Sequence, residues 1–222
     1  MVKCLDRLLK DLEKLNDVHL EQGEAIGKAF GGAVYAFDLL SFAVLNRSMS
    51  LTSGFITLMR KDNFVAAIPL IRTQLDNFLR YAAGWLVSDP HEFAAKILSG
   101  KHIRNIKTKE GKRMTDRFLV DEFSKKYKWI KSVYENTSGY IHLSDKHMLI
   151  NITELDSKQR TTTFKISDKD DHIPEKFKVE AVMAFTKITE LILHRIYSWR
   201  YTKDNPQALR KQKRGSSQVH KI

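Results

Sequence analysis

The sequence predicts an all-α fold: a helical bundle of five or six main helices that carries a small β-hairpin at about residues 147–167. Apolar residues recur at spacings of three and four through several long stretches, a pattern typical of amphipathic helices. The 222 residues, 42% of them hydrophobic, suffice for one sizeable core. We therefore expect one helical domain over residues 1–202, followed by a basic tail at 203–222 that is too polar to fold.

The stretch 63–87 predicts the central helix, with Asn63 as its N-cap and a kink at Pro69. Its packing face repeats at helical spacing through Phe64, Ile68, Ile71, Leu75, Phe78, Ala82 and Trp85. Arg72 and Asp76 lie four residues apart beside that face, so we expect them to form a pair directed towards the interior. The pair is interpreted either as a structural salt bridge or as part of a functional site.

Other helices are predicted on both sides of this one. They cover 3–22, 33–61, a short segment that begins at Pro90, a segment from Thr115 to about Ile141 with a break near 125–128, and 171 to about 201. The β-branched segments 147–153 and 160–166 predict the two strands of the hairpin.

Positive charge is concentrated in one segment and in the tail. Of the net charge of +12, residues 96–131 contribute twelve Lys and Arg against four Asp and Glu, and residues 203–222 contribute six against one. Concentrated positive charge attracts phosphate backbones without reading sequence. The stretch 101–113 has no apolar period and predicts a loop, whose nucleic-acid contacts we assign to Lys101, Arg104, Lys107, Lys109, Lys112 and Arg113. The alternative is a solvated loop kept soluble by its lysines.

Several classes of protein are disfavoured. The single Cys4 has no partner for a disulfide, which favours a cytoplasmic protein, and the charged N-terminal residues do not form a signal peptide. We expect no membrane partner, because the most apolar run is too short to span a bilayer. No phosphate-binding or dinucleotide motif is present, so no cofactor is expected. His142, Asp145 and His147 offer a weak alternative as metal ligands, and we expect no metal.

A second candidate region is YENTSGYIHLSDKH, residues 134–147. If the preceding helix reaches Ile141, its carbonyl end would favour a protonated His142 that exchanges protons near neutral pH. The alternative is a helix-ending histidine bonded to backbone. Nearby aromatic residues alternate with lysines, as in a surface that stacks single-stranded RNA, although core packing explains the same spacing.

Two motifs resemble those of the HEPN superfamily: IRTQLDNFLRYAAGWL, with Arg72 and Asp76, and YENTSGYIH, with His142. The resemblance covers about residues 33–147 and the last helix. It implies a helical homodimer that often acts as a metal-independent ribonuclease in toxin or antiphage systems, with RNA as substrate and an antitoxin as partner. The sequence departs from the family's motif, because residues 135–137 are Glu, Asn and Thr where an arginine is expected.

The resemblance implies an RNA-directed protein of prokaryotic defence or stress response, with Arg72, Asp76 and His142 as catalytic residues. His142 would transfer protons, Arg72 would stabilise charge on phosphorus, Asp76 would orient Arg72, and Asn136 and Tyr140 would bind phosphate. The alternative is a non-catalytic helical module that binds nucleic acid or a partner protein through its basic segment.

Overall fold

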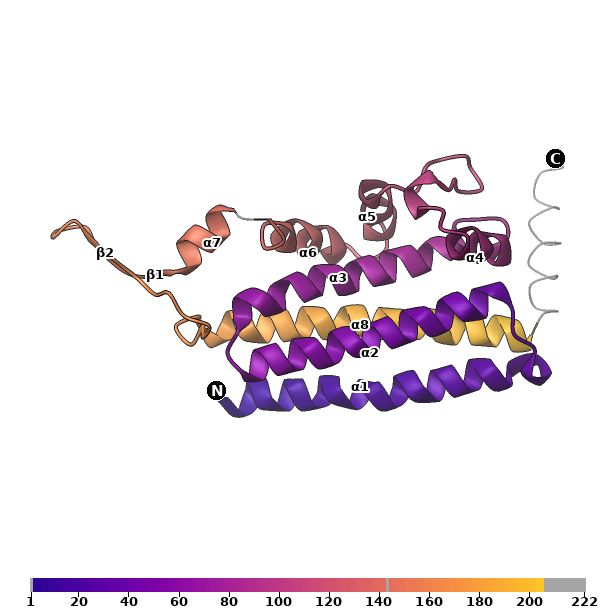
Figure 1. The fold of residues 1–222 in the computed structure, drawn as a ribbon, viewed down its shortest axis with the longest axis horizontal. Helices are drawn as coiled ribbons and strands as arrows, with labels where there is room; N and C mark the ends of the chain where they lie inside the picture. Colours follow the sequence, from indigo (N-terminus) through magenta and orange to yellow (C-terminus); the bar gives the residue numbers. More distant parts are fainter. Residues whose placement is uncertain (1, 143, 206–222) are drawn as a thin grey trace.

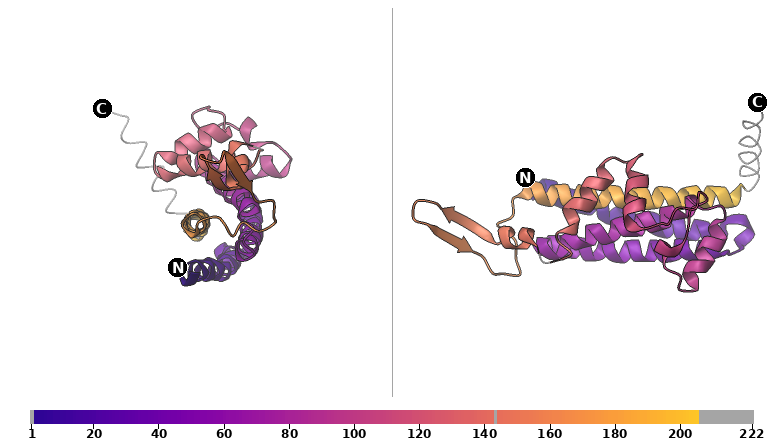
Figure 2. Two further views of the ribbon diagram at one scale, coloured as in Figure 1. Left: turned by 90° about the vertical axis from the view of Figure 1, so that its left-hand side faces the viewer. Right: turned by 90° about the horizontal axis from the view of Figure 1, so that it is seen from above.

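The computed structural model describes residues 2–142 and 144–205. Four long helices form a bundle (Figure 1): α1 (Val2–Lys28), α2 (Ala36–Arg60), α3 (Phe64–Ala82) and α8 (Glu175–Asp204). Three shorter helices, α4 (Pro90–Leu98), α5 (Asp116–Ser124) and α6 (Trp129–Ser138), lie on the opposite side of the molecule from α1 (Figure 2). Short 3-10 turns lie between α1 and α2 (Ala29–Gly32), between α3 and α4 (Ala83–Trp85) and between α4 and α5 (Ile103–Asn105). The predicted all-α bundle with a small hairpin is confirmed.

Helix α3 is the central element, because it packs against α2 and α8 in the bundle and against α5 and α6 outside it. Asn63 caps it by accepting a hydrogen bond from the Ala66 amide at 3.2 Å, as predicted. The helix continues through Pro69 without ending. Its predicted apolar face is buried from Phe64 to Ala82, with Leu75 and Phe78 fully enclosed, whereas Trp85 is partly exposed in the 3-10 turn after the helix. Helix α4 begins at Pro90 as predicted, with Asp89 as its N-cap, and Thr115 caps α5.

A buried ion pair closes one end of the bundle. Lys203 Nζ lies 2.9 Å from Asp38 Oδ2, and the exposed fractions of the two side chains are 2% and 0%. Trp199 Nε1 donates to Asp38 Oδ1 at 2.7 Å, and Lys203 also donates to the Ile26 carbonyl. The last helix therefore ends at Asp204 rather than about Tyr201, because burial of Lys203 holds its final turn. The rest of the predicted tail, 206–222, lies outside the described residues.

A network of buried polar side chains links all four long helices. His19 Nδ1 lies 2.6 Å from the Leu15 carbonyl, so this nitrogen donates, and Nε2 accepts from the Ser48 hydroxyl at 2.8 Å. Gln74 donates to Ser48 and to Thr189. Because these side chains come from α1, α2, α3 and α8, their hydrogen bonds fix the register of the helices.

The hairpin differs from the prediction in its first strand. Residues 145–150 form the helix α7 (Asp145–Ile150), and the antiparallel strands are β1 (Ile152–Asp156) and β2 (Thr161–Phe164). The predicted strand at 147–153 is wrong, because the Ser144 hydroxyl accepts from the Lys146 amide and starts a helical turn. The strands extend beyond the end of the bundle (Figures 1 and 2).

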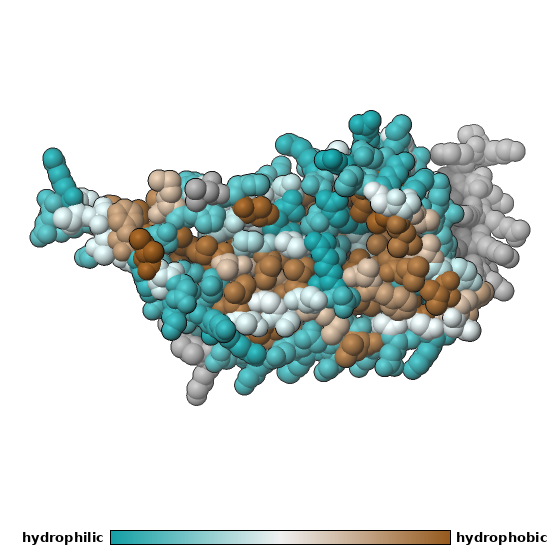
Figure 3. Space-filling model, viewed as in Figure 1, coloured by the Kyte–Doolittle hydropathy of each residue, from teal (hydrophilic) through white to brown (hydrophobic). Residues whose placement is uncertain are grey.

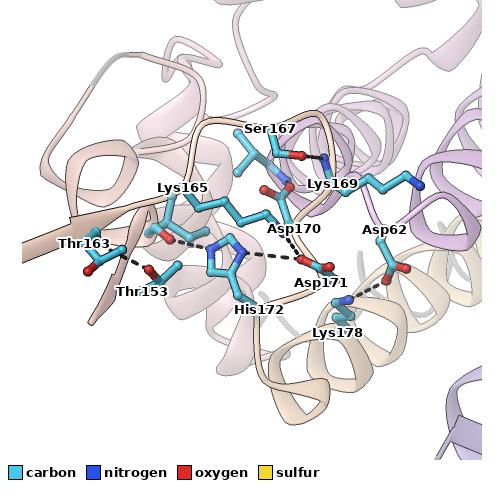
Figure 4. Close-up of polar contacts among 12 residues, drawn as sticks. Asp62, Thr153, Thr163, Lys165, Ser167, Lys169, Asp170, Asp171, His172 and Lys178 are labelled. Atoms are coloured by element: carbon cyan, nitrogen blue, oxygen red, sulfur yellow. Dashed lines mark hydrogen bonds and ion pairs between the residues drawn. The ribbon is translucent and has the colours of Figure 1, made fainter. Parts of the chain in front are cut away.

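The connection from the hairpin to α8 is tied to the bundle (Figure 4). Asp170 accepts from the Val65 amide at 2.8 Å, and its own amide donates to the Asp62 carbonyl at 2.7 Å. Lys178 donates to the Asp62 carboxylate at 2.5 Å, and His172 Nε2 lies 2.8 Å from the Ile150 carbonyl. These contacts fix where the hairpin leaves the bundle.

Figure 3 shows an apolar surface over α2 and α3 that a hydrophilic band crosses near its middle. Among the residues with described structure, no helix is both long and apolar enough to cross a membrane.

Candidate nucleic-acid interface

The basic lobe, residues 96–131, contains the end of α4, the connection to α5, α5 itself and the start of α6. All six predicted nucleic-acid contacts in this lobe are exposed, namely Lys101, Arg104, Lys107, Lys109, Lys112 and Arg113. Within 101–113 the only acidic residue is Glu110, which lies 3.8 Å from Lys109 Nζ. Positive charge in this stretch is therefore largely unneutralised and faces solvent.

The stretch 101–113 is more ordered than the predicted loop. Lys107 and Arg113 form an antiparallel bridge, and Gly111 takes φ +82 in the turn between them. The Lys109 amide donates to the Leu86 carbonyl at 2.9 Å, and this hydrogen bond holds the turn against the segment that follows α3. The apolar side chains of Ile103, Ile106 and Met114 are buried beneath it. These buried apolar side chains hold the backbone in place, so the exposed basic side chains extend from a segment of defined structure.

Arg72 is 9% exposed, and its guanidinium carbon lies 3.7 Å from the centre of the Tyr134 ring on α6. Its Nε is buried, and no residue in 2–142 or 144–205 forms a hydrogen bond with it. Among the described residues no carboxylate forms an ion pair with Arg72, so the expected pair with Asp76 is wrong. The cation instead lies against an aromatic face, which attracts it through the ring quadrupole.

Asp76 pairs with the next arginine along α3. Both of its carboxylate oxygens accept from Arg80 Nε at 2.7 Å, and Arg47 on α2 lies 3.9 Å away. Arg80 also donates to Asp116 on α5 at 2.9 Å. An acid four residues before a base is the better helical order, which explains why Asp76 selects Arg80 over Arg72. Burial lowers the pKa of Arg80, but the hydrogen bonds and charge of Asp76 outweigh it and raise that pKa.

His142 lies beyond the end of α6, which stops at Ser138 instead of continuing to Ile141. The side chains of Thr137 and Ser138 bond back to carbonyls four residues earlier, and Gly139 follows as the C-cap. His142 is exposed in the turn that follows. No hydrogen bond or ion pair joins its side chain to Arg72 within the described part of the chain, so a shared catalytic site stays a prediction.

Asn136 and Tyr140 both lie near Lys146, whose Nζ donates to the Asn136 carbonyl at 2.5 Å and lies 5.3 Å from the centre of the Tyr140 ring. Asn136 is exposed on α6, and its amide donates to Ser132 at 3.2 Å. Tyr140 is half-buried in an apolar pocket of about 550 Å³ that Leu149, Ile150 and Phe177 also line. Burial raises the pKa of the Tyr140 phenol. Tyr140 is thus directed towards the junction of α7 and α8 rather than towards the basic lobe.

A second arginine, Arg195, was not predicted as a site residue, and no carboxylate among the described residues forms an ion pair with it. The guanidinium carbon of Arg195 on α8 lies 5.1 Å from the centre of the Trp85 ring, and no described residue forms a hydrogen bond with its buried Nε. In the sequence, Arg195 shows only as a charged residue next to Ile196, which is buried in the structure. A lone charge on a helix is usually solvated, so the tertiary structure was needed to find it.

These features define a class of protein: a four-helix bundle whose outer helices carry an exposed basic lobe. No family model, curated protein or solved structure matches the chain. Among the described residues, no three His, Cys, Asp or Glu side chains gather closely enough to hold a metal ion.

Proposed function

We propose that the protein binds nucleic acid through the phosphate backbone, using the basic lobe. The observation that carries the proposal is the set of six exposed basic side chains in residues 101–113, projecting from backbone that is tied to the bundle. A fixed array of cations loses little conformational freedom when it meets a polyanion. Each phosphate contact releases counterions, so binding of this kind weakens steeply with salt.

The test compares two fourfold variants in a salt titration with labelled RNA. Lys107, Lys109, Lys112 and Arg113 are changed to Ser in the first variant. The control variant changes the exposed residues Lys10, Lys61, Lys158 and Lys187 to Ser, which removes the same charge elsewhere. We expect the first variant to lose at least about tenfold in affinity and to show a shallower dependence on salt, whereas the control stays near wild type. Equal losses in both would contradict a localised interface.

A metal-independent endoribonuclease is the second candidate, in keeping with the HEPN resemblance. The state of Arg72 favours the ribonuclease candidate. Its guanidinium is nearly buried and its Nε has no partner among the described residues, so it can donate to a phosphate oxygen without first breaking a salt bridge. Arg72 would then stabilise charge on phosphorus while His142 transfers protons. The observed pairs of Asp76 replace its expected role of orienting Arg72.

The ribonuclease candidate is tested by incubating the pure protein with mixed RNA and EDTA. Cleavage that survives chelation and is lost in both His142→Ala and Arg72→Ala supports the enzyme. No cleavage, together with salt-sensitive RNA binding, supports the non-catalytic module. A defence role and an antitoxin partner rest on the family resemblance and are tested only after this assay.

We also propose a homodimer formed through the apolar face over α2 and α3. Exposed positions along α2 include the small or apolar Leu39, Ala43 and Ser50, where a second helix can approach closely, together with the polar Asn46 and Arg47. Arg47 and Asp76 lie 3.9 Å apart on this face. Because the face carries both signs of charge, two copies related by a two-fold axis would present complementary charges to each other.

A further inference from the structure

Arg195 is a partly buried cation surrounded by aromatic side chains. Its guanidinium lies over the Trp85 ring, and its Nε has no hydrogen-bond partner among the residues that the structure describes. In the described part of the chain no Asp or Glu forms an ion pair with it. Burial lowers the pKa of Arg195, and the Tyr127 and Tyr81 phenols act in the opposite direction more weakly. A partly buried cation without a carboxylate partner is stabilised strongly when a ligand supplies an anion that accepts its hydrogen bonds.

Tyr127 joins this group to the basic lobe. Lys126 Nζ lies 5.3 Å from the centre of the Tyr127 ring, and the ring itself packs edge-on against Phe78 on α3. Tyr127 and Trp85 are partly exposed residues. We call Trp85, Lys126, Tyr127 and Arg195 the Arg195 cluster. Its members come from the 3-10 turn after α3, the segment between α5 and α6, and α8, and Tyr127 lies near enough to Arg195 to act on its pKa.

We propose that the Arg195 cluster binds single-stranded nucleic acid. The Arg195 guanidinium takes a backbone phosphate, and the Tyr127 and Trp85 rings stack on unpaired bases. Unpaired bases expose their faces to such rings, whereas a duplex keeps its bases stacked inside. The inference rests on the proposed function and adds to it a preference for single strands, with a bound strand that runs from the basic lobe to α8.

The experiment measures the affinity of the full chain for a labelled RNA strand, and for the same strand in a duplex, by fluorescence anisotropy. The test variants are Arg195→Gln and Tyr127→Leu. The matched variants are Arg195→Lys, which keeps the charge but cannot form bidentate hydrogen bonds, and Tyr127→Phe, which keeps the aromatic ring. Lys187→Gln removes one exposed charge from the same helix and serves as the control.

We expect wild type to bind the single strand more tightly than the duplex. Arg195→Gln and Tyr127→Leu should each weaken single-strand binding by roughly tenfold, and Tyr127→Leu should change duplex binding by less than about twofold. Tyr127→Phe and Lys187→Gln should bind as wild type does, and Arg195→Lys should fall between wild type and Arg195→Gln. Thermal melting by circular dichroism checks that each variant is folded.

The two proposals fail in different ways. If duplex and single strand bind equally and the Arg195 and Tyr127 variants match wild type, while the fourfold basic-lobe variant is weakened, the Arg195 cluster is not a binding site and the proposed function stands. If wild type binds neither RNA, the proposed function fails and this inference fails with it. Should Tyr127→Leu unfold, the comparison of Arg195→Gln with Arg195→Lys and Lys187→Gln still decides the outcome.

Discussion

The guanidinium of Arg72 lies 3.7 Å from the centre of the Tyr134 ring, and this contact joins α3 to α6 in place of an ion pair. A nearly buried charge without a counter-ion lowers the stability of the fold. We predict that Arg72→Met, which keeps the length of the side chain, leaves the free energy of unfolding unchanged or raises it by up to about 2 kcal/mol. Urea unfolding measures this, and a loss of several kcal/mol would show that Arg72 is mainly structural.

The pair of Asp38 and Lys203 is predicted to contribute strongly to stability. Asp38→Ala removes the counter-ion of the buried Lys203 and leaves Trp199 Nε1 and the Tyr35 amide without their acceptor. We expect a loss of about 3–5 kcal/mol in the free energy of unfolding. The control is Glu24→Ala, which breaks an exposed pair with Lys28 and should cost less than about 1 kcal/mol. Similar losses in both variants would contradict the assignment.

His19 makes stability depend on pH. Burial lowers its pKa below the ordinary value of 6.5, so the folded protein holds the neutral imidazole. Below about pH 6.5 the unfolded chain binds a proton that the folded protein resists, and stability therefore falls as pH falls. Stability measured from pH 7.5 down to 5 should decrease in wild type and decrease less in His19→Gln. Parallel curves for the two proteins would rule out His19 as the source.

Asp76 is predicted to act on stability rather than on RNA binding. Asp76→Asn removes the charge that holds Arg80 and Arg47, and these partly exposed pairs contribute about 1 kcal/mol in total. RNA affinity should stay within about twofold of wild type, because the lost acid lies outside the basic lobe. A complete loss of cleavage or binding in the folded variant would instead support the expected catalytic role.

The homodimer proposal predicts that one large charged side chain on α2 separates the copies. Ala43→Arg places a long cation on the exposed face of this helix. We expect light scattering after gel filtration to show a shift from dimer to monomer. Met183→Arg, at a position 46% exposed on α8, should leave the dimer intact. A wild-type protein that is already monomeric at micromolar concentration would overturn the proposal.

Local chemistry was enough to place most elements. The caps Asn63, Asp89 and Thr115 lie where short polar side chains precede apolar periods, and α3 shows its buried face through helical spacing alone. The prediction failed where one short segment could adopt two structures. Residues 147–153 are β-branched enough for a strand, yet the hydroxyl of Ser144 starts α7.

The candidate site was predictable only in part. Basic residues of the lobe are exposed because charge avoids the interior whatever the fold, so their surface position followed from their type. The partners of Arg72, Asp76 and Arg195 did not follow, because a charged side chain on a helix can reach several neighbours. Which neighbour it meets depends on helices far away in the sequence.

The sequence by itself determined the all-α class, the central helix and the concentration of positive charge in residues 96–131, since apolar period and charge are local properties. Only the tertiary structure decided that Asp76 binds Arg80, that Tyr134 covers Arg72, and that Lys203 is buried against Asp38. The physical reason is that the energy of a charge is set by its surroundings in space, and distant helices supply those surroundings only after they pack.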